Sequence, residues 1–340
     1  MFKIDVYPHI MPPKYREALY SKSSATSRVG RFGLSIWPAM HDVDERFRIM
    51  DHHEGYVQIL NITEPPLEDV ASPDVAAELA RIANDEMAEL VMKYPDRFVA
   101  AVACLPMNNM DAALKEVDRA IVDLRFKGIQ IYSNIMDKPL DSPEFDPLFE
   151  KMNYYDLPIL IHPRHIKDGP RAFPKPEGEA KDEVGRWARR FFNWPFETTI
   201  TMGRIVYSGM LDRYPNLKFI THHCGGLLPY QAYRISGSTE HNEMMRRSYF
   251  SRYFTRKPID YYKMLYGDTA CYGNTASLMC GYAFFGAEHV LFGTDMPWDS
   301  QGGYRYVRET IRSVEEMAIP DEDKKKIFED NARKLFRLPI

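Results

Sequence analysis

Five side chains that could bind a metal or transfer a proton each follow a short apolar segment of the chain. They are four imidazoles and one carboxylate, namely His9, His162, His222, His223 and Asp295. Neutral imidazole and carboxylate groups bind divalent transition metals at about 2.0–2.2 Å and leave positions open for water or substrate. Any one of these histidines alone would be interpreted as a hydrogen-bonded loop residue. Their shared position after apolar segments favours a common metal site instead.

Asp295 lies in segment 290–298, VLFGTDMPW, which shows this pattern most clearly. Three apolar residues and a glycine precede Thr294 and Asp295, and Pro297 then prevents further strand pairing. The pattern is typical of a short, buried parallel strand that ends in a carboxylate. The alternative is that Asp295 only caps the turn that follows.

Eight segments of this kind run through the chain, and we predict a strand in each. They are residues 2–7, 56–62, 98–104, 128–132, 158–162, 218–222, 264–268 and 290–293. Because a helical stretch follows each strand, the pattern favours an α/β fold with a parallel sheet, closed as a (βα)8 TIM barrel. An open doubly wound sheet is the alternative, but the sequence lacks the glycine-rich fingerprint expected after its first strand. Active sites of such barrels lie at the C-terminal ends of the strands, where the five polar residues fall.

No composition break divides the 340 residues, so we predict a single barrel domain over residues 1–340. Residues 11–41 and 164–185 contain clusters of proline and glycine. They are interpreted as loop insertions over the mouth of the barrel, because loops of this length are usually functional. Residues 303–340 are predicted to form charged amphipathic helices at the C-terminal end.

Charge and composition narrow the classes of partner and compartment. The net charge of −4 gives no reason to expect nucleic acid or an anionic membrane surface as a partner. The sequence has no run of 18 apolar residues, so no membrane-spanning helix is predicted. The four cysteines lack the spacing of a CxxC motif or a disulfide framework, which predicts a reduced, cytoplasmic protein.

Several motifs together resemble the amidohydrolase superfamily. They are IDVYPHIMP, FKGIQI, LPILIHP, NWPFETT, YPNLKFITHHCGGLLP and VLFGTDMPW, in the family's order from residue 2 to about residue 300. The chain is most similar to the branch that contains aminocarboxymuconate-semialdehyde decarboxylase and the hydroxybenzoate decarboxylases. This resemblance implies a βα barrel with one divalent metal, typically zinc or manganese. It also implies non-oxidative decarboxylation, or a related hydrolysis or hydration.

Carried over by position, the resemblance implies that His9, His162 and Asp295 are metal ligands. His223, within HCGGLLP, matches the histidine that works beside the metal as an acid or base. Its neighbour His222 is expected to point back into the barrel packing. Either His223 or a protonated Asp295 would then exchange a proton with the substrate carbon.

The chain departs from the family pattern at Tyr7, where the related decarboxylases have histidine or glutamate. A phenol has a reference pKa near 10 and is a poor ligand unless a metal ionises it. Tyr7 and His9 are two residues apart, so both side chains are expected on the same face of the strand. Tyr7 is therefore a candidate catalytic residue that binds the metal as phenolate or hydrogen-bonds the substrate. The remaining alternative is that it only packs.

Two sets of residues are candidates for substrate binding. Arg46 and Arg48, in DERFRIMD, fall where the resemblance places an arginine that binds a substrate carboxylate. The alternative for both is an exposed helix arginine. Trp194 and Trp298, with Trp37, could stack on a substrate ring, and ordinary loop packing is the alternative for each.

These expectations combine into a metal-dependent, non-oxidative decarboxylase of a small aromatic or unsaturated carboxylic acid. A first alternative keeps the fold and the metal but activates water, which would give a hydrolase or hydratase. A second alternative is a metal-free enzyme or a ligand-binding barrel, because Tyr7 replaces a ligand. The resemblance further suggests that the protein is a homodimer.

Overall fold

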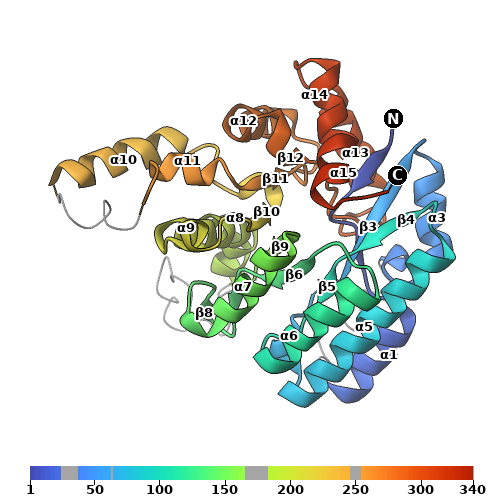
Figure 1. The fold of residues 1–340 in the computed structure, drawn as a ribbon. Helices are drawn as coiled ribbons and strands as arrows, with labels where there is room; N and C mark the ends of the chain where they lie inside the picture. Colours follow the sequence, from blue (N-terminus) through green and yellow to red (C-terminus); the bar gives the residue numbers. More distant parts are fainter. Residues whose placement is uncertain (24–36, 63, 165–182, 246–253, 340) are drawn as a thin grey trace.

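The computed structural model describes residues 1–23, 37–62, 64–164, 183–245 and 254–339 (Figure 1). Short parallel strands form the centre of the fold. In chain order they are β1 (Lys3–Asp5), β3 (Tyr56–Ile62), β4 (Phe98–Ala101) with its continuation β5 (Ala103–Cys104), β6 (Ile129–Tyr132), β9 (Pro158–His162), β10 (Lys218–Thr221), β11 (Tyr266–Asp268) and β12 (Val290–Leu291). β3 pairs with β1 and β4, and a second paired run has the order β5, β6, β9, β10, β11, β12. All of these strand pairs are parallel.

Backbone hydrogen bonds between the first and last strands complete the ring. The Val6 N–H donates to the carbonyl of Phe292 at 3.0 Å, and the Asp295 N–H donates to the carbonyl of Tyr7 at 3.1 Å. On the other side of the ring, β4 and β5 lie end to end between β3 and β6 and so connect the two paired runs. The predicted (βα)8 barrel is therefore confirmed.

A buried carboxylate, Asp5, strengthens the same closure. It accepts hydrogen bonds from the Tyr7 N–H at 3.0 Å, from the Tyr56 hydroxyl at 2.6 Å, and from both the N–H and the hydroxyl of Thr294. Burial raises the pKa of Asp5 to about 6, although each of these hydrogen bonds lowers it. One polar group thus joins the first, second and last strands inside the barrel.

The first strand contains a one-residue bulge at its C-terminal end. Asp5 of β1 lies opposite Gln58, and His9 of β2 (His9–Ile10) lies opposite Asn61 on the same strand β3. Four steps along the first strand therefore match three steps along β3. Pro8, which has no N–H to donate to a strand ladder, falls within this bulge.

Helices connect the strands and cover the outside of the barrel (Figure 1). The longer ones are α1 (Pro13–Lys22), α3 (Val43–Asp51), α5 (Pro73–Lys93), α6 (Met110–Asp118), α7 (Asp146–Tyr155), α8 (Glu183–Tyr207), α10 (Ala232–Met245), α12 (Thr275–Phe285) and α13 (Tyr304–Glu315). Shorter helical segments are η1 (Pro38–Met40), α4 (Leu67–Val70), η2 (Arg119–Asp123), η3 (Pro143–Phe145), α9 (Met210–Arg213), η4 (His223–Gly225), α11 (Pro258–Tyr262), η5 (Ala287–His289), α14 (Asp321–Lys325), η6 (Lys326–Asp330) and α15 (Asn331–Leu335). A hairpin of β7 (Asn134–Ile135) and β8 (Lys138–Pro139) follows β6.

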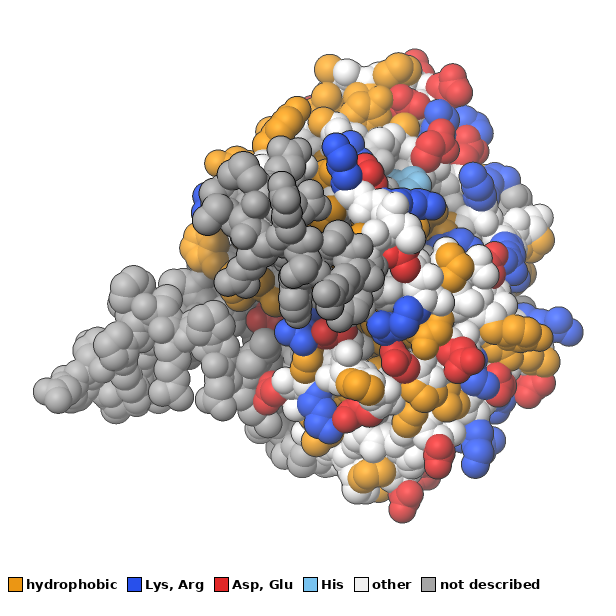
Figure 2. All heavy atoms as spheres, turned by 60° about the vertical axis from the view of Figure 1, so that its left-hand side comes forward, with side chains coloured by type: hydrophobic (Ala, Val, Ile, Leu, Met, Phe, Trp, Pro, Cys, Tyr) orange, Lys and Arg blue, Asp and Glu red, His pale blue; other side chains and the backbone are white. Residues whose placement is uncertain are grey.

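The outer surface carries charges of both signs. Basic and acidic side chains are interspersed over the described part of the face in Figure 2. Such mixing gives no extended basic area on this face that would favour a polyanion. Among the described helices, none combines the length and the apolar character needed to cross a membrane.

The structure corrects the prediction that residues 11–41 form a loop throughout. α1 occupies part of this segment, and its buried residues Tyr15 and Leu19 are one helical turn apart. The Glu86 carboxylate of α5 caps the helix by accepting from the N–H groups of Lys14 at 3.0 Å and Tyr15 at 2.8 Å. Residues 24–36 and 165–182, which make up much of the two predicted insertions, lie outside the described residues.

The structure also corrects the role predicted for the two arginines of α3. Arg46 is fully buried, and its guanidinium donates to the backbone carbonyls of Ala39, Pro8 and His9 and to the side chain of Gln58. The prediction that it binds a substrate carboxylate is wrong, because its donors are used in the barrel wall.

Arg48 does not replace Arg46 in that role. Its side chain is 64% exposed and pairs with Glu45 of the same helix. It is therefore a surface residue of the kind considered as the alternative, and the structure brings neither arginine of α3 into the group of strand-end side chains.

We expect Arg46→Ala to lower the free energy of unfolding by roughly 3 kcal/mol or more, because several buried acceptors would lose their donor and each costs ~1–3 kcal/mol. The matched variant Arg48→Ala should change it by less than about 0.5 kcal/mol, as is usual for a surface position. Denaturant unfolding of the two variants measures both effects. Equal stabilities would show that the buried guanidinium does not hold the barrel wall together.

Candidate metal centre

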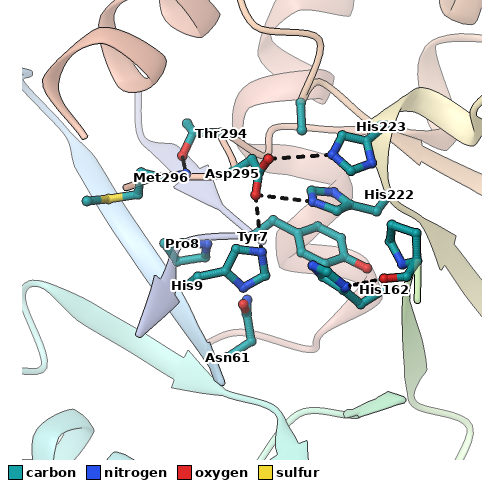
Figure 3. A network of polar contacts seen from close by, with 12 residues as sticks. Tyr7, Pro8, His9, Asn61, His162, His222, His223, Thr294, Asp295 and Met296 are labelled. Atoms are coloured by element: carbon teal, nitrogen blue, oxygen red, sulfur yellow. Dashed lines mark hydrogen bonds and ion pairs between the residues drawn. The ribbon is translucent and has the colours of Figure 1, made fainter. Parts of the chain in front are cut away.

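The five strand-end residues lie together at one end of the barrel (Figure 3). His9 comes from β2 and His162 ends β9, while His222 and His223 follow β10 and Asp295 follows β12. All five are largely shielded from solvent, with His9 and His222 at 0% exposure and His162 and Asp295 at 2%. The sequence therefore predicted correctly which residues meet, although not how each one is oriented.

The Asp295 carboxylate stands at the centre of the group and has two different faces. Its Oδ1 atom lies 3.2 Å from His9 Nε2 and 3.4 Å from His222 Nε2. Its Oδ2 atom lies 3.5 Å from His223 Nε2 and accepts a hydrogen bond of 3.0 Å from the Tyr272 hydroxyl. Burial alone would raise the pKa of Asp295, but the surrounding imidazoles hold this pKa well below its usual value. Asp295 is consequently an anion that separates two groups of side chains.

Several buried nitrogen atoms of the cluster make no hydrogen bond within the described residues. These atoms include both ring nitrogens of His9 and Nε2 of His222. The ligand atoms of His9, His162 and His222 all lie within 4.8 Å of one another, as do those of His222, His223 and Asp295. Buried polar atoms without a hydrogen bond are costly. Asp295 Oδ1 lies near two of these nitrogens, and a metal ion would provide all of them with a partner. The residues present thus fit a divalent metal.

His162 has the protonation state expected of a metal ligand. Its Nδ1 atom is 2.8 Å from the carbonyl oxygen of Pro163, which requires the proton on Nδ1 and leaves Nε2 with a free lone pair. Burial and the neighbouring imidazoles lower the pKa of His162 well below its usual value. Burial likewise lowers the pKa of His9. Both rings are therefore neutral, the form in which imidazole binds a metal.

His222 points into the site, so the prediction that it turns back into the barrel packing is wrong. Its Nδ1 atom is 2.5 Å from Oδ2 of Asp268, the last residue of β11. Burial would lower the pKa of His222, but the carboxylates of Asp268 and Asp295 raise it to about 9. The sequence signal for this arrangement is Asp268 itself, a carboxylate at the end of the seventh predicted strand.

Tyr7 lines the site as a neutral phenol. It is fully buried, and its ring stacks on His222 with centroids 4.0 Å apart and an angle of 18° between the planes. Its hydroxyl makes no hydrogen bond within the described residues. Burial, reinforced by the charges of Asp268 and Asp295, raises the pKa of Tyr7 well above its usual value, which disfavours a phenolate.

His223 lies on the other face of Asp295, where a residue that sequence analysis missed contacts it. The Tyr272 hydroxyl is 3.1 Å from His223 Nε2 and donates to Asp295 Oδ2. Burial lowers the pKa of His223, so this ring can accept a proton near neutral pH. Tyr272 stacks on Tyr306 with ring centroids 4.5 Å apart. Its position shortly after β11 was the available signal, since every other residue of the group also follows a strand.

A carboxyl group after β3 was also missed. Burial, together with the negative charge of Asp295, raises the pKa of Glu64 to about 7. A carboxyl group with such a pKa can both give and take a proton near neutral pH. The signal in the sequence was again the position of Glu64 just beyond a predicted strand.

The structure separates the two predicted tryptophans. Trp194 of α8 borders the site, with its ring centroid 5.7 Å from that of His162 and 5.9 Å from that of His223. Trp298 instead packs edge-on against Trp37, with centroids 4.8 Å apart. Trp194 is thus the better placed of the two to contact a planar ligand.

Comparisons with known proteins agree with this geometry. Residues 17–338 match the amidohydrolase family. The chain is 31% identical over 316 residues to gamma-resorcylate decarboxylase of Polaromonas sp. JS666, covering 89% of this chain and 91% of that protein. It is 27% identical over 311 residues to 2-amino-3-carboxymuconate-6-semialdehyde decarboxylase of Dictyostelium discoideum, covering 87% and 82%.

A solved structure supports the same relationship. Dihydroxybenzoic acid decarboxylase from Polaromonas sp. JS666, crystallised with manganese and the inhibitor 2-nitroresorcinol, superimposes with a TM-score of 0.76 at 27% identity. The match covers 99% of this chain and 97% of that one. The likeness therefore extends over the whole barrel.

We expect the purified protein to bind one divalent transition metal ion per chain. His162→Ala should lose most of that metal, because a buried, neutral imidazole would be removed from the ligand cluster. His52→Ala, which removes an exposed imidazole of the same type, should keep it. Elemental analysis of both variants measures the difference, and full occupancy in His162→Ala would refute the ligand assignment.

Proposed function

The chain belongs to the amidohydrolase family, and on this premise we propose that it is a metal-dependent, non-oxidative decarboxylase of a small aromatic carboxylic acid. The observation that carries the proposal is the division of Asp295 between a metal-ligand face and a proton-transfer face. Relatives that cover about nine tenths of the chain, such as the Polaromonas enzyme at 89%, are named as decarboxylases. The whole chain would act as a single functional domain.

His9, His162 and Asp295 would hold the ion, for which zinc and manganese both suit imidazole and carboxylate ligands. When bound, a divalent ion supplies Lewis acidity and a template for the substrate carboxylate and an adjacent oxygen. The neutral state of His9 and His162 means that these two ligands need lose no proton first. The protein provides the buried, low-dielectric setting in which such charges act strongly.

Decarboxylation exchanges a carboxylate for a proton at one carbon atom. The bond to the carboxylate carbon breaks, its electron pair remains on the ring carbon, carbon dioxide leaves, and a proton takes the vacant position. His223, once it has taken up a proton, is the candidate donor, and the Asp295 anion would stabilise that charge, because their Nε2 and Oδ2 atoms are 3.5 Å apart. Tyr272 touches both atoms and orients them towards each other. This pair would deliver the proton on the side of the site away from His9.

Aromatic surroundings suit a planar substrate. Trp194 borders His162 and His223, and the hydroxyl of Tyr7 is available to hydrogen-bond a substrate oxygen. Aromatic rings stack in offset or edge-to-face geometry with centroids about 4.5–7 Å apart. The side chain of Trp194 thus supports the choice of an aromatic acid over an aliphatic unsaturated one.

The expected product is carbon dioxide from a carboxyl-labelled dihydroxybenzoate supplied to the metal-loaded protein. His223→Asn should keep its metal but lower turnover by about 10²–10⁴-fold, the usual size of an acid–base contribution. Released label and metal content are measured on the same samples, with His52→Ala as a surface control. A product that has gained water without release of label would favour the hydrolase or hydratase alternative and contradict the proposal.

We also propose that the protein works as a homodimer in the cytoplasm. Large apolar side chains are exposed at and before the start of α10, with Leu227 at 40%, Tyr230 at 79% and Tyr233 at 93% exposure. Such a concentration supports a surface for association. Light scattering should give twice the chain mass of 39.6 kDa, and a mass of one chain would refute the dimer.

The absence of disulfides among Cys104, Cys224, Cys271 and Cys280 supports a reducing compartment.

A further inference from the structure

We propose that His222 is a metal ligand in addition to His9, His162 and Asp295, and that Asp268 and Tyr7 hold its ring in the coordinating position. The inference rests on the proposed metal-dependent function and specifies which side chains complete the ligand set. It also gives the adjacent residues His222 and His223 different roles. His222 would bind the ion, whereas His223 would transfer a proton.

The distances around Asp295 Oδ1 support this assignment. His9 Nε2 lies 3.2 Å from that atom and His222 Nε2 lies 3.4 Å from it. Ligand atoms that each stand about 2.0–2.2 Å from one ion are separated by roughly 3–3.5 Å in tetrahedral or octahedral geometry. His222 also belongs to the group in which its ligand atom and those of His9 and His162 lie within 4.8 Å of one another. The distance of His222 Nε2 from Asp295 Oδ1 thus matches that of His9 Nε2, which the proposed function already takes as a ligand.

The partner of the other ring nitrogen fixes the tautomer of His222. Asp268 Oδ1 accepts hydrogen bonds of 3.0 Å from the N–H groups of Cys224 and Ala270, so Oδ2 is left to face His222 Nδ1. A carboxylate oxygen requires the proton on Nδ1, so Nε2 is the nitrogen that faces the site and is available to a metal ion. Nε2 is buried and lies 3.4 Å from Asp295 Oδ1, without the geometry of a hydrogen bond. A carboxylate behind a ligating imidazole is the usual support for a metal-bound histidine.

Tyr7 holds the plane of the same ring. Its phenol ring lies 4.0 Å from the His222 ring at an angle of 18°, so the two are stacked. A stacked neighbour on one side and a carboxylate at one edge leave little freedom of rotation about the side chain. Tyr7 would therefore act as a positioning residue for the ligand next to it, while its hydroxyl stays available to the substrate.

The test measures metal affinity rather than activity. Metal-free protein is titrated with Zn²⁺ or Mn²⁺ against a chelator of known affinity, for the wild type and for His222→Asn, Asp268→Asn and His223→Asn. His222→Asn removes the proposed ligand and should weaken affinity by more than about 100-fold, beyond the 10–100-fold range seen when only a supporting residue is lost. His223→Asn, the matched change at the adjacent residue, should bind close to the wild-type value.

Asp268→Asn tests the inference without removing the imidazole. The amide oxygen must stay on the two backbone N–H groups, so the amide NH₂ faces His222 Nδ1 and forces the proton onto Nε2. We expect a 10–100-fold loss of affinity in this near-isosteric variant. Circular dichroism of the metal-free proteins will show whether His222→Asn folds. If it does not fold, the affinity of Asp268→Asn decides whether His222 is a ligand.

Wild-type affinity in Asp268→Asn together with wild-type affinity in a folded His222→Asn would overturn the inference. So would a large loss in His223→Asn with none in His222→Asn, because the ligand would then be the other histidine. Neither result depends on carbon dioxide release. A failure of the decarboxylase proposal would leave the affinities unchanged, and a failure of the His222 assignment would leave His9→Ala and His162→Ala deficient in metal.

Discussion

Asp5 accepts hydrogen bonds from the second strand and from residues that follow the first and last strands, and a backbone hydrogen bond joins Asp295 to Tyr7 close by. This closure determines the geometry of the site, because the residues it connects are within a few positions of the residues that do chemistry. Asp295 is one residue beyond Thr294, and His9 is two residues beyond Tyr7. The separation of the central carboxylate from the first imidazole is thus set by the barrel itself rather than by flexible loops. Such preorganisation is what a tight ligand cluster requires.

Two buried carboxylates, Asp268 and Asp295, flank His222, so the site needs nearby positive charge or hydrogen-bond donors. Buried negative charges are stable only when positive charge or several donors surround them. His9, His162 and His223 are kept neutral by burial, so His222 is the ring that carries positive charge in the absence of a cation. A divalent ion would satisfy the same need. The electrostatics of the protein and the spacing of its ligand atoms therefore point to the same kind of occupant.

Strand positions and strand-end residues were predictable from the sequence because both depend on local patterns. An apolar run followed by a polar residue marks each strand, so the meeting of His9, His162 and Asp295 follows from the fold. Features that depend on distant partners were not predictable. The orientation of His222 depends on Asp268, 46 positions away, and on the end of β10 at Thr221, one residue earlier than expected.

Partners far away in the sequence also determine α1 and the roles of Arg46 and Tyr272. α1 is capped by a carboxylate about 70 residues distant, as the hydrogen bonds from Lys14 and Tyr15 to Glu86 show. Arg46 finds its acceptors on other segments, including Pro8 at a separation of 38 residues. Tyr272 reaches His223 across 49 positions. The role of a buried polar residue therefore depends on which neighbour the fold brings next to it.

Because of the bulge at Pro8, the number of residues at the end of the first strand matters more than the types of those residues. Four residues there span the distance that three residues span on β3. Removing one would turn His9 to the opposite side of the strand, because successive side chains alternate between faces. Inserting one would do the same. During divergence of such barrels, this short segment should accept exchanges of side chain, as at Tyr7, far more readily than insertions or deletions.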